Sequence, residues 1–214
     1  MSVEVASRPG RIELLLAAER LIAEQGPAVS LREVCAAAGQ RNTSAVQYHF
    51  GGRDGLIAAV IELRQESLER ERLLRFAELD AAGRTDMRDV LEAQMLPSMR
   101  TPYLDGSTHY ARFIEKVRGH DYLATPDVIA ERDWPGTRIF IGRLQNLMHD
   151  LPPELRLLRA RSGFSAFFAL LADIERDDPA YAGNPRRALE SHVIDALLGM
   201  LQAPVTRHLT SPEF

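Results

Sequence analysis

Apolar residues recur at spacings of three and four positions along most of this chain, and that spacing predicts amphipathic helices. No segment has a convincing strand pattern, so the predicted fold is all-α, with about nine helices. The predicted helices are residues 11–25, 30–38, 43–50, 53–79, 86–99, 107–118, 136–149, 153–174 and 185–201, with one or two further turns at 126–132.

Two short helices between residues 30 and 50 have the most distinctive pattern. Ser30 is the predicted N-cap of the first, and Glu33 three residues later completes a capping box. Gly39 ends this helix, and the pair Gly51 and Gly52 ends the second. The second helix has a narrow apolar stripe and an acid-free face of hydrogen-bonding side chains: Thr43, Ser44, Gln47, Tyr48 and His49. This combination is typical of a helix-turn-helix motif that reads the major groove of DNA.

The same stretch carries a resemblance to a known family. Residues 45–60, AVQYHFGGRDGLIAAV, resemble the recognition helix and linker of the tetracycline-repressor (TetR) family of bacterial transcription regulators, and residues 31–39, LREVCAAAG, are similar to that family's second helix. The resemblance covers roughly residues 11–63. It implies a helix-turn-helix head, residues 1–52, and a helical body, residues 53–214, that binds a small molecule and dimerises.

The DNA contacts are predicted from this motif. The Gln47 carboxamide can bond an adenine edge in a bidentate way, and Thr43 and Ser44 are short enough for close approach. The resemblance implies phosphate contacts for Tyr48 and His49, and Arg53 adds charge at a helix N-terminus. The alternative is a set of ordinary polar surface residues. The complete predicted set is Ser30, Arg32, Arg41, Asn42, Thr43, Ser44, Gln47, Tyr48, His49 and Arg53.

Composition and charge narrow the class of protein. Charged residues make up 26% and hydrophobic residues 45%, which is ordinary for a soluble globular protein. The chain has no apolar run long enough for a membrane span and no signal-peptide core, so we expect a cytoplasmic protein without a membrane partner. The net charge of −4 argues against a general nucleic-acid binder, so DNA binding has to depend on the local placement of basic side chains.

The middle helices contain methionine and aromatic side chains at helical spacing. The resemblance implies a ligand cavity here, and such residues can line an adaptable apolar pocket, although plain core packing is an equal alternative. The predicted ligand-binding residues are Met95, Met99, Tyr103, Tyr110, Phe113, Phe140, Leu144 and Phe168. We expect a largely hydrophobic effector.

The last two helices have large apolar faces, which we expect to form a four-helix interface in a homodimer. The predicted dimerisation residues are Phe164, Phe167, Leu171, Leu189, Val193, Leu197 and Met200. In contrast, the charged run of residues 64–72 predicts a solvated helix face.

Catalytic and metal chemistry have little support in the sequence. The histidines form no HxxxH pair or Cys/His spacing, and there is no phosphate loop or nucleophile elbow, so we expect no metal, no cofactor and no enzyme activity. Cys35 is the only cysteine and is expected to be a small buried hydrophobe. The predicted function is a ligand-responsive transcriptional repressor that binds a pseudo-palindromic operator as a homodimer and is released by a small effector. The alternative is an α-helical enzyme or small-molecule carrier in which the helix-turn-helix is only a packing motif.

Overall fold

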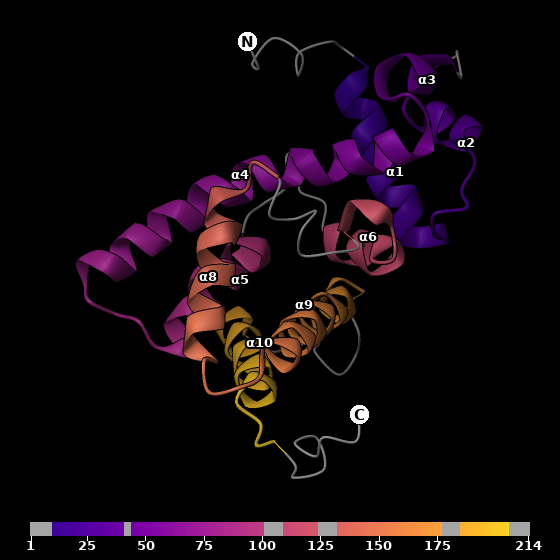
Figure 1. Ribbon diagram of the computed structural model, residues 1–214. Coiled ribbons are helices and arrows are strands. Elements are labelled where there is room, and N and C mark those ends of the chain that lie inside the picture. The colour runs from indigo at the N-terminus through magenta and orange to yellow at the C-terminus, as the bar shows by residue number, and fades with distance from the viewer. Residues whose placement is uncertain (1–9, 41–43, 101–108, 124–131, 177–184, 206–214) are drawn as a thin grey trace.

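The computed structural model describes the chain apart from residues 1–9, 41–43, 101–108, 124–131, 177–184 and 206–214. The described part contains nine α-helices, one 3₁₀ helix and no strand, so the all-α prediction is confirmed (Figure 1). The elements are α1 (Arg11–Gln25), α2 (Leu31–Ala37), α3 (Ser44–Phe50), α4 (Arg53–Ala81), α5 (Met87–Arg100), α6 (Tyr110–Val117), η1 (Asp121–Leu123), α8 (Pro135–Leu147), α9 (Pro153–Glu175) and α10 (Arg186–Leu201).

Helices α1, α2 and α3 form a small head around the first turns of α4. The predicted capping box is confirmed: the Ser30 hydroxyl accepts from the Glu33 N–H at 3.2 Å, and the Glu33 carboxylate accepts from the Ser30 N–H at 3.0 Å. Gly39 follows α2 with φ 68°, a left-handed conformation that glycine adopts without strain. Cys35 is buried, as expected. The head is therefore stabilised by both local caps and its apolar core.

The end of α3 packs very closely against the start of α4. A Cβ atom on Gly55 would lie only 1.8 Å from the Phe50 carbonyl oxygen, so only glycine is compatible with this approach. Val46 of α3 and Leu56 of α4 are buried in the same core. This packing holds α3 directly on the first turns of α4.

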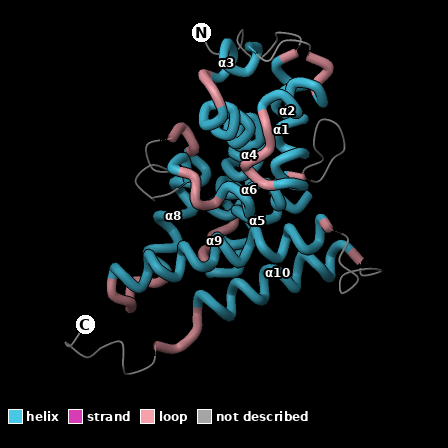
Figure 2. The backbone as a smooth tube through the Cα atoms, turned by 90° about the vertical axis from the view of Figure 1, so that its right-hand side faces the viewer, coloured by secondary structure: helices cyan, strands magenta, loops and turns pink. Residues whose placement is uncertain are grey.

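Helix α4 is the longest element and extends from the head along the body (Figure 1). It packs against α1 and α3 in the head and against α5 and α8 in the body, while α6 packs against both α1 and α9. Helices α9 and α10 lie side by side at the end of the body opposite the head (Figure 2). The two ends of α4 thus belong to different parts of the molecule.

The prediction of a solvated charged face on α4 is wrong for half of the run. Arg64, Glu69 and Arg72 are each no more than 5% exposed. Arg64 pairs with Glu19 of α1 at 2.6 Å, and Arg72 pairs with Glu69 at 2.9 Å. Because each charge has a partner of opposite sign and further hydrogen bonds, burial is possible.

Candidate DNA-binding surface and ligand cavity

Helix α3 lies at the outer edge of the head (Figure 1). Ser44 and Gln47 are exposed, and Tyr48 is 73% exposed, whereas Val46 on the opposite face is completely buried. The Tyr48 and His49 rings meet edge to face with centroids 5.0 Å apart. Arg41, Asn42 and Thr43, which are also predicted contacts, lie outside the described residues. The described part of α3 therefore exposes hydrogen-bonding side chains to solvent, while Val46 on its other side packs into the core of the head.

Two predicted DNA contacts belong to the start of α2. Both Ser30 and Arg32 are exposed. The Ser30 hydroxyl donates to the Glu33 carboxylate at 2.6 Å, and the hydrogen bonds from Ser30 lower the pKa of that carboxyl. The Glu33 carboxylate thus caps α2, and Arg32 is the basic side chain of this helix.

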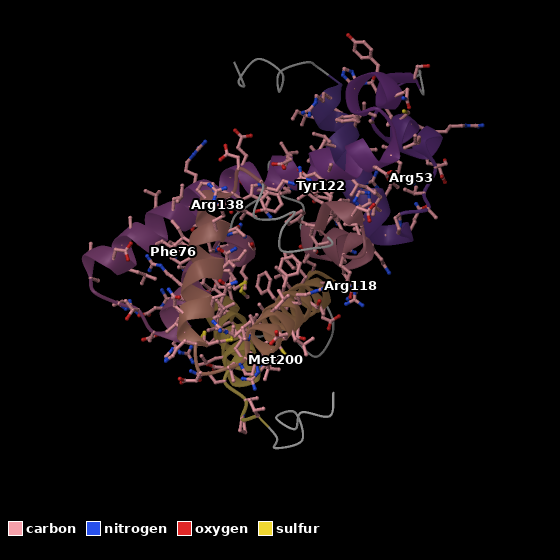
Figure 3. The ribbon with its side chains drawn as sticks, in the orientation of Figure 1. Arg53, Phe76, Arg118, Tyr122, Arg138 and Met200 are labelled. Atoms are coloured by element: carbon pink, nitrogen blue, oxygen red, sulfur yellow. The ribbon has the colours of Figure 1, made fainter. Side chains whose placement is uncertain are left out.

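Arg53 has a structural contact that the sequence did not predict. Its Nη1 atom donates to the Pro27 and Val29 carbonyl oxygens, the second at 2.6 Å (Figure 3). These carbonyls belong to the loop between α1 and α2, so Arg53 fastens the start of α4 to the head. Any phosphate contact by Arg53 would be additional to this role.

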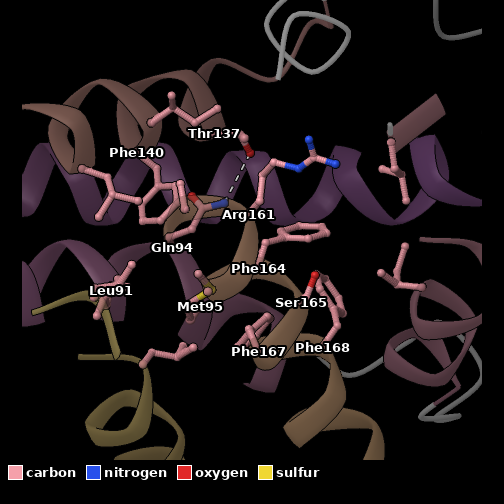
Figure 4. Close-up of a pocket in the computed structure, with 18 of the residues that line it drawn as sticks. Leu91, Gln94, Met95, Thr137, Phe140, Arg161, Phe164, Ser165, Phe167 and Phe168 are labelled. Atoms are coloured by element: carbon pink, nitrogen blue, oxygen red, sulfur yellow. Dashed lines mark hydrogen bonds between the residues drawn. The ribbon is translucent and has the colours of Figure 1, made fainter. Parts of the chain in front are cut away.

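The body contains a cavity of about 630 Å³, within the usual range for small-molecule sites. Five of the eight predicted ligand-binding residues line it: Met95, Tyr110, Phe140, Leu144 and Phe168 (Figure 4). Met99 and Phe113 do not; Phe113 is completely buried and stacks on Tyr110 with centroids 6.2 Å apart. Tyr103 lies outside the described residues. Helical spacing alone did not separate lining residues from their packed neighbours.

Aromatic rings from α9 form much of one wall. The Phe164 and Phe168 rings are 4.8 Å apart, Phe167 and Phe168 are 5.0 Å apart, and Phe168 meets Tyr110 edge to face at 6.2 Å. Figure 4 shows these phenylalanines opposite Gln94 and Phe140. The rings provide a large, contiguous apolar surface for a ligand.

A network of buried polar groups lies behind the cavity on the side of α4. The Glu69 carboxylate accepts from the Gly136 N–H at 2.6 Å, the Thr137 N–H at 3.1 Å and the Thr137 hydroxyl at 2.5 Å. Arg72 donates to Gln65 at 2.7 Å and to the Gln94 carbonyl at 3.1 Å. Burial lowers the pKa of Arg72, and the adjacent Glu69 carboxylate opposes that effect. The network joins α4 to α5 and α8.

The same side includes a hydrogen bond between α4 and the cavity wall. Gln65 Nε2 donates to the Tyr110 hydroxyl at 3.4 Å. Burial raises the pKa of Tyr110 well above its usual value, so the phenol stays neutral. No group of His, Cys, Asp or Glu side chains in the described residues is arranged to hold a metal ion.

The predicted dimerisation residues need a correction. Phe167, Leu171, Val193 and Leu197 are each at most 7% exposed within a single chain, because α9 packs against α6 and α10, and α10 packs against α5. These four are core residues of the protomer, so the argument from an uncovered apolar face is wrong for them. Phe164, Leu189 and Met200 are half-buried. Leu157 and Leu158 of α9, at 43% and 60% exposure, are apolar side chains that the sequence analysis did not select.

Comparisons with known proteins match the head of this chain to one family. Residues 14–60 match the family model described as bacterial regulatory proteins, tetR family. No curated protein matches the chain.

Solved structures share the fold of the whole chain. A putative TetR-family transcriptional regulator from Rhodococcus sp. has 15% identity and a TM-score of 0.52, covering 91% of this chain and 99% of its own. A transcriptional regulator from Rhodococcus sp. Rha1 has 24% identity and a TM-score of 0.53, covering 89% and 95%. NalD of Pseudomonas aeruginosa, the secondary repressor of a multidrug efflux pump, has 19% identity and a TM-score of 0.51, covering 88% and 94%. Residues 14–60 thus match the tetR family of bacterial regulatory proteins, and the chain shares its fold with solved structures of transcriptional regulators.

Proposed function

We propose that this protein is a transcriptional repressor whose DNA affinity is controlled by a small molecule. The observation that carries the proposal is the outward polar face of α3, with Gln47 and Tyr48 exposed, on a head that α4 joins to a body containing a cavity of about 630 Å³. The family match, to regulatory proteins, supports a binding protein without enzyme activity. NalD, described as a repressor, supports the sign of the regulation.

The operator would be read by two copies of the head. The exposed polar residues of α3 enter the major groove, Gln47 reads a base edge, and Arg32, Tyr48 and His49 contact phosphates. A homodimer with two-fold symmetry would place its two heads about 34–36 Å apart, or a near multiple of that spacing, on a pseudo-palindrome. The dimer surface would be formed by the exposed sides of α9 and α10, including Leu158.

The connection between cavity and head runs through α4. At the head, Arg64 of α4 pairs with Glu19 of α1; in the body, Glu69 and Arg72 of α4 bond to α8 and α5. A ligand that shifts α5 or α8 would therefore move α4 and tilt the head. It can act only through its differential affinity for the two head positions, and a coupling of about 1–3 kcal/mol is typical.

Selection of DNA fragments tests the regulator directly. Full-length protein would be mixed with sheared fragments of the genome that encodes it, and the retained fragments would be sequenced. We expect enrichment of a pseudo-palindromic sequence with half-sites about one helical turn, or a near multiple, apart. Retention without any enriched sequence, or no retention at low salt, would contradict the proposal.

A further inference from the structure

The charged side chains that line the cavity in the described part of the chain are all arginines. Among the residues that the structure describes, the lining includes four arginines, Arg72, Arg118, Arg156 and Arg161, and no aspartate or glutamate. A wall of this kind creates a positive potential in the cavity, to which the half-buried Arg156 contributes more than Arg118 and Arg161, which are exposed to water. An organic cation is therefore disfavoured in this cavity and an anion favoured.

One of the four arginines is already neutralised, and the other three are not. Arg72 is paired with Glu69 at 2.9 Å. None of the ion pairs among the described residues includes Arg118, Arg156 or Arg161. Arg156 and Arg161 both come from α9, and Figure 4 shows Arg161 close to Phe164. The guanidinium groups therefore remain available to an anionic partner beside the aromatic wall.

Two polar atoms at the cavity have unused hydrogen-bonding capacity. The Nε atom of Arg156 and the Oε1 atom of Gln94 are buried and have no hydrogen-bond partner among the described residues. Gln94 is only 6% exposed, and its Nε2 atom donates to the Thr137 hydroxyl at 3.4 Å (Figure 4). A buried donor or acceptor without a partner costs free energy, and a ligand that satisfies it recovers that cost. The cavity thus offers a cationic donor and a neutral acceptor to one ligand.

The rest of the lining is apolar. Phe140, Phe164 and Phe168 provide aromatic faces, and Leu91, Met95 and Leu144 provide aliphatic and thioether surface. Burial of a ring or chain against this surface removes apolar area from water and so favours binding. Apolar walls with a few polar anchors are typical of sites that orient a small organic ligand.

We propose that the cavity binds an amphipathic organic anion, with an aromatic or aliphatic body against the phenylalanines and an acidic group bonded by Arg156 and Arg161. A hydroxyl or N–H on the same molecule would donate to Gln94 Oε1. This inference deepens the proposed function, because it takes the cavity as the effector site and names the class of effector. It also adds a negative charge to the sequence-based expectation of a largely hydrophobic effector.

A matched pair of fluorescent probes tests the charge preference. The anion 8-anilinonaphthalene-1-sulfonate and the neutral N-phenyl-1-naphthylamine share the same ring system and N–H, and differ by the sulfonate. We expect wild-type protein to bind the anion at least about tenfold more tightly, as one charge-assisted hydrogen bond would give. Ala160→Trp, which fills the cavity from its wall, should abolish the binding of both probes and so locate the site.

The double variant Arg156→Gln/Arg161→Gln separates charge recognition from cavity shape. It should weaken binding of the sulfonate about tenfold or more and leave the neutral probe within about twofold. Arg70→Gln is the control, because Arg70 is exposed and does not line the cavity, and it should change neither affinity.

Three results would overturn the proposal: equal or tighter binding of the neutral probe by wild type, no binding of either probe, or equal loss of both probes in the double variant. These measurements report on ligand binding in the cavity and do not involve DNA. If the probe measurements fail while the protein still selects an operator sequence, only the proposed class of effector is contradicted. If the selection of DNA fragments fails, the proposed regulatory function itself is contradicted.

Discussion

Replacement of Glu69 by glutamine should destabilise the protein far more than its position in a charged run suggests. The Glu69 carboxylate accepts four hydrogen bonds, from Arg72, Gly136 N–H, and both the N–H and hydroxyl of Thr137. In Glu69→Gln, the amide NH₂ group would face donors in place of an acceptor. The Arg72 guanidinium, with a side chain 5% exposed, would lose its ion-pair partner among the described residues, and the first N–H groups of α8 would lose their acceptor.

The magnitude follows from the burial of the pair. Removal of one partner from a buried ion pair costs roughly 3–5 kcal/mol, because the other charge stays desolvated. The remaining bonds from Arg72 to Gln65, the Gln94 carbonyl and Ser98 involve neutral acceptors, so they do not replace the missing charge. For a chain of this length each kcal/mol corresponds to roughly 2–4 °C, which gives a fall in Tm of about 6–20 °C.

Glu71→Gln is the matched control on the same helix. Glu71 pairs with Arg75 at 2.6 Å, with side chains 35% and 27% exposed, and such a surface pair contributes at most about 1 kcal/mol. Urea denaturation followed by circular dichroism would compare the free energies of unfolding of both variants with wild type. If Glu69→Gln is no more destabilising than Glu71→Gln, the buried network does not hold α4, α5 and α8 together.

Three further predictions concern packing, capping and pH. Gly136→Ala should cost about 1–3 kcal/mol in denaturation experiments, because its Cβ would lie 2.8 Å from Arg72 Cβ, whereas Gly142→Ala on the same helix meets nothing within 4 Å and should be neutral or stabilising. Ser30→Ala should cost about 1 kcal/mol by loss of the capping box, with exposed Ser162→Ala as its neutral control. Burial raises the pKa of Glu175 to about 7 from 4.5, so the folded state holds this proton more tightly than the unfolded chain. The stabilising contribution of the protonated carboxyl is therefore complete below about pH 4.5 and is lost as pH rises through about 7, on the order of 1–3 kcal/mol in all. Glu175→Gln should flatten the dependence of the free energy of unfolding on pH over this range. An unchanged pH dependence in the variant would contradict the raised pKa of Glu175.

The head was predictable from the sequence because its determinants are local. The capping box at Ser30, the glycine after α2 and the apolar spacing around Val46 within α3 each depend on residues only a few positions apart. The outward face of α3 followed from the same periodicity. Arg53 was the exception, because its carbonyl partners are 24 and 26 residues away in the sequence.

The body was less predictable because its determinants are long-range. A charged run such as residues 64–72 has the same spacing whether it faces water or a partner helix; Arg64 is buried because α1 supplies Glu19. The apolar faces of α9 and α10 gave no sign that the chain's own α5 and α6 cover Phe167 and Leu197. The cavity arginines were missed for a related reason, since a basic residue on a helix is most often solvated.

The central claim is that the exposed face of α3 reads DNA sequence, and a binding titration of Gln47→Ala tests it most directly. The selected operator fragment and a scrambled fragment would be titrated by fluorescence anisotropy, with Gln25→Ala, an exposed glutamine at the end of α1, as control. We expect Gln47→Ala to lose roughly 1–3 kcal/mol on the operator and almost nothing on the scrambled fragment, and Gln25→Ala to match wild type on both. Equal affinity of wild type and Gln47→Ala for the operator, or equal losses on both fragments, would contradict the claim.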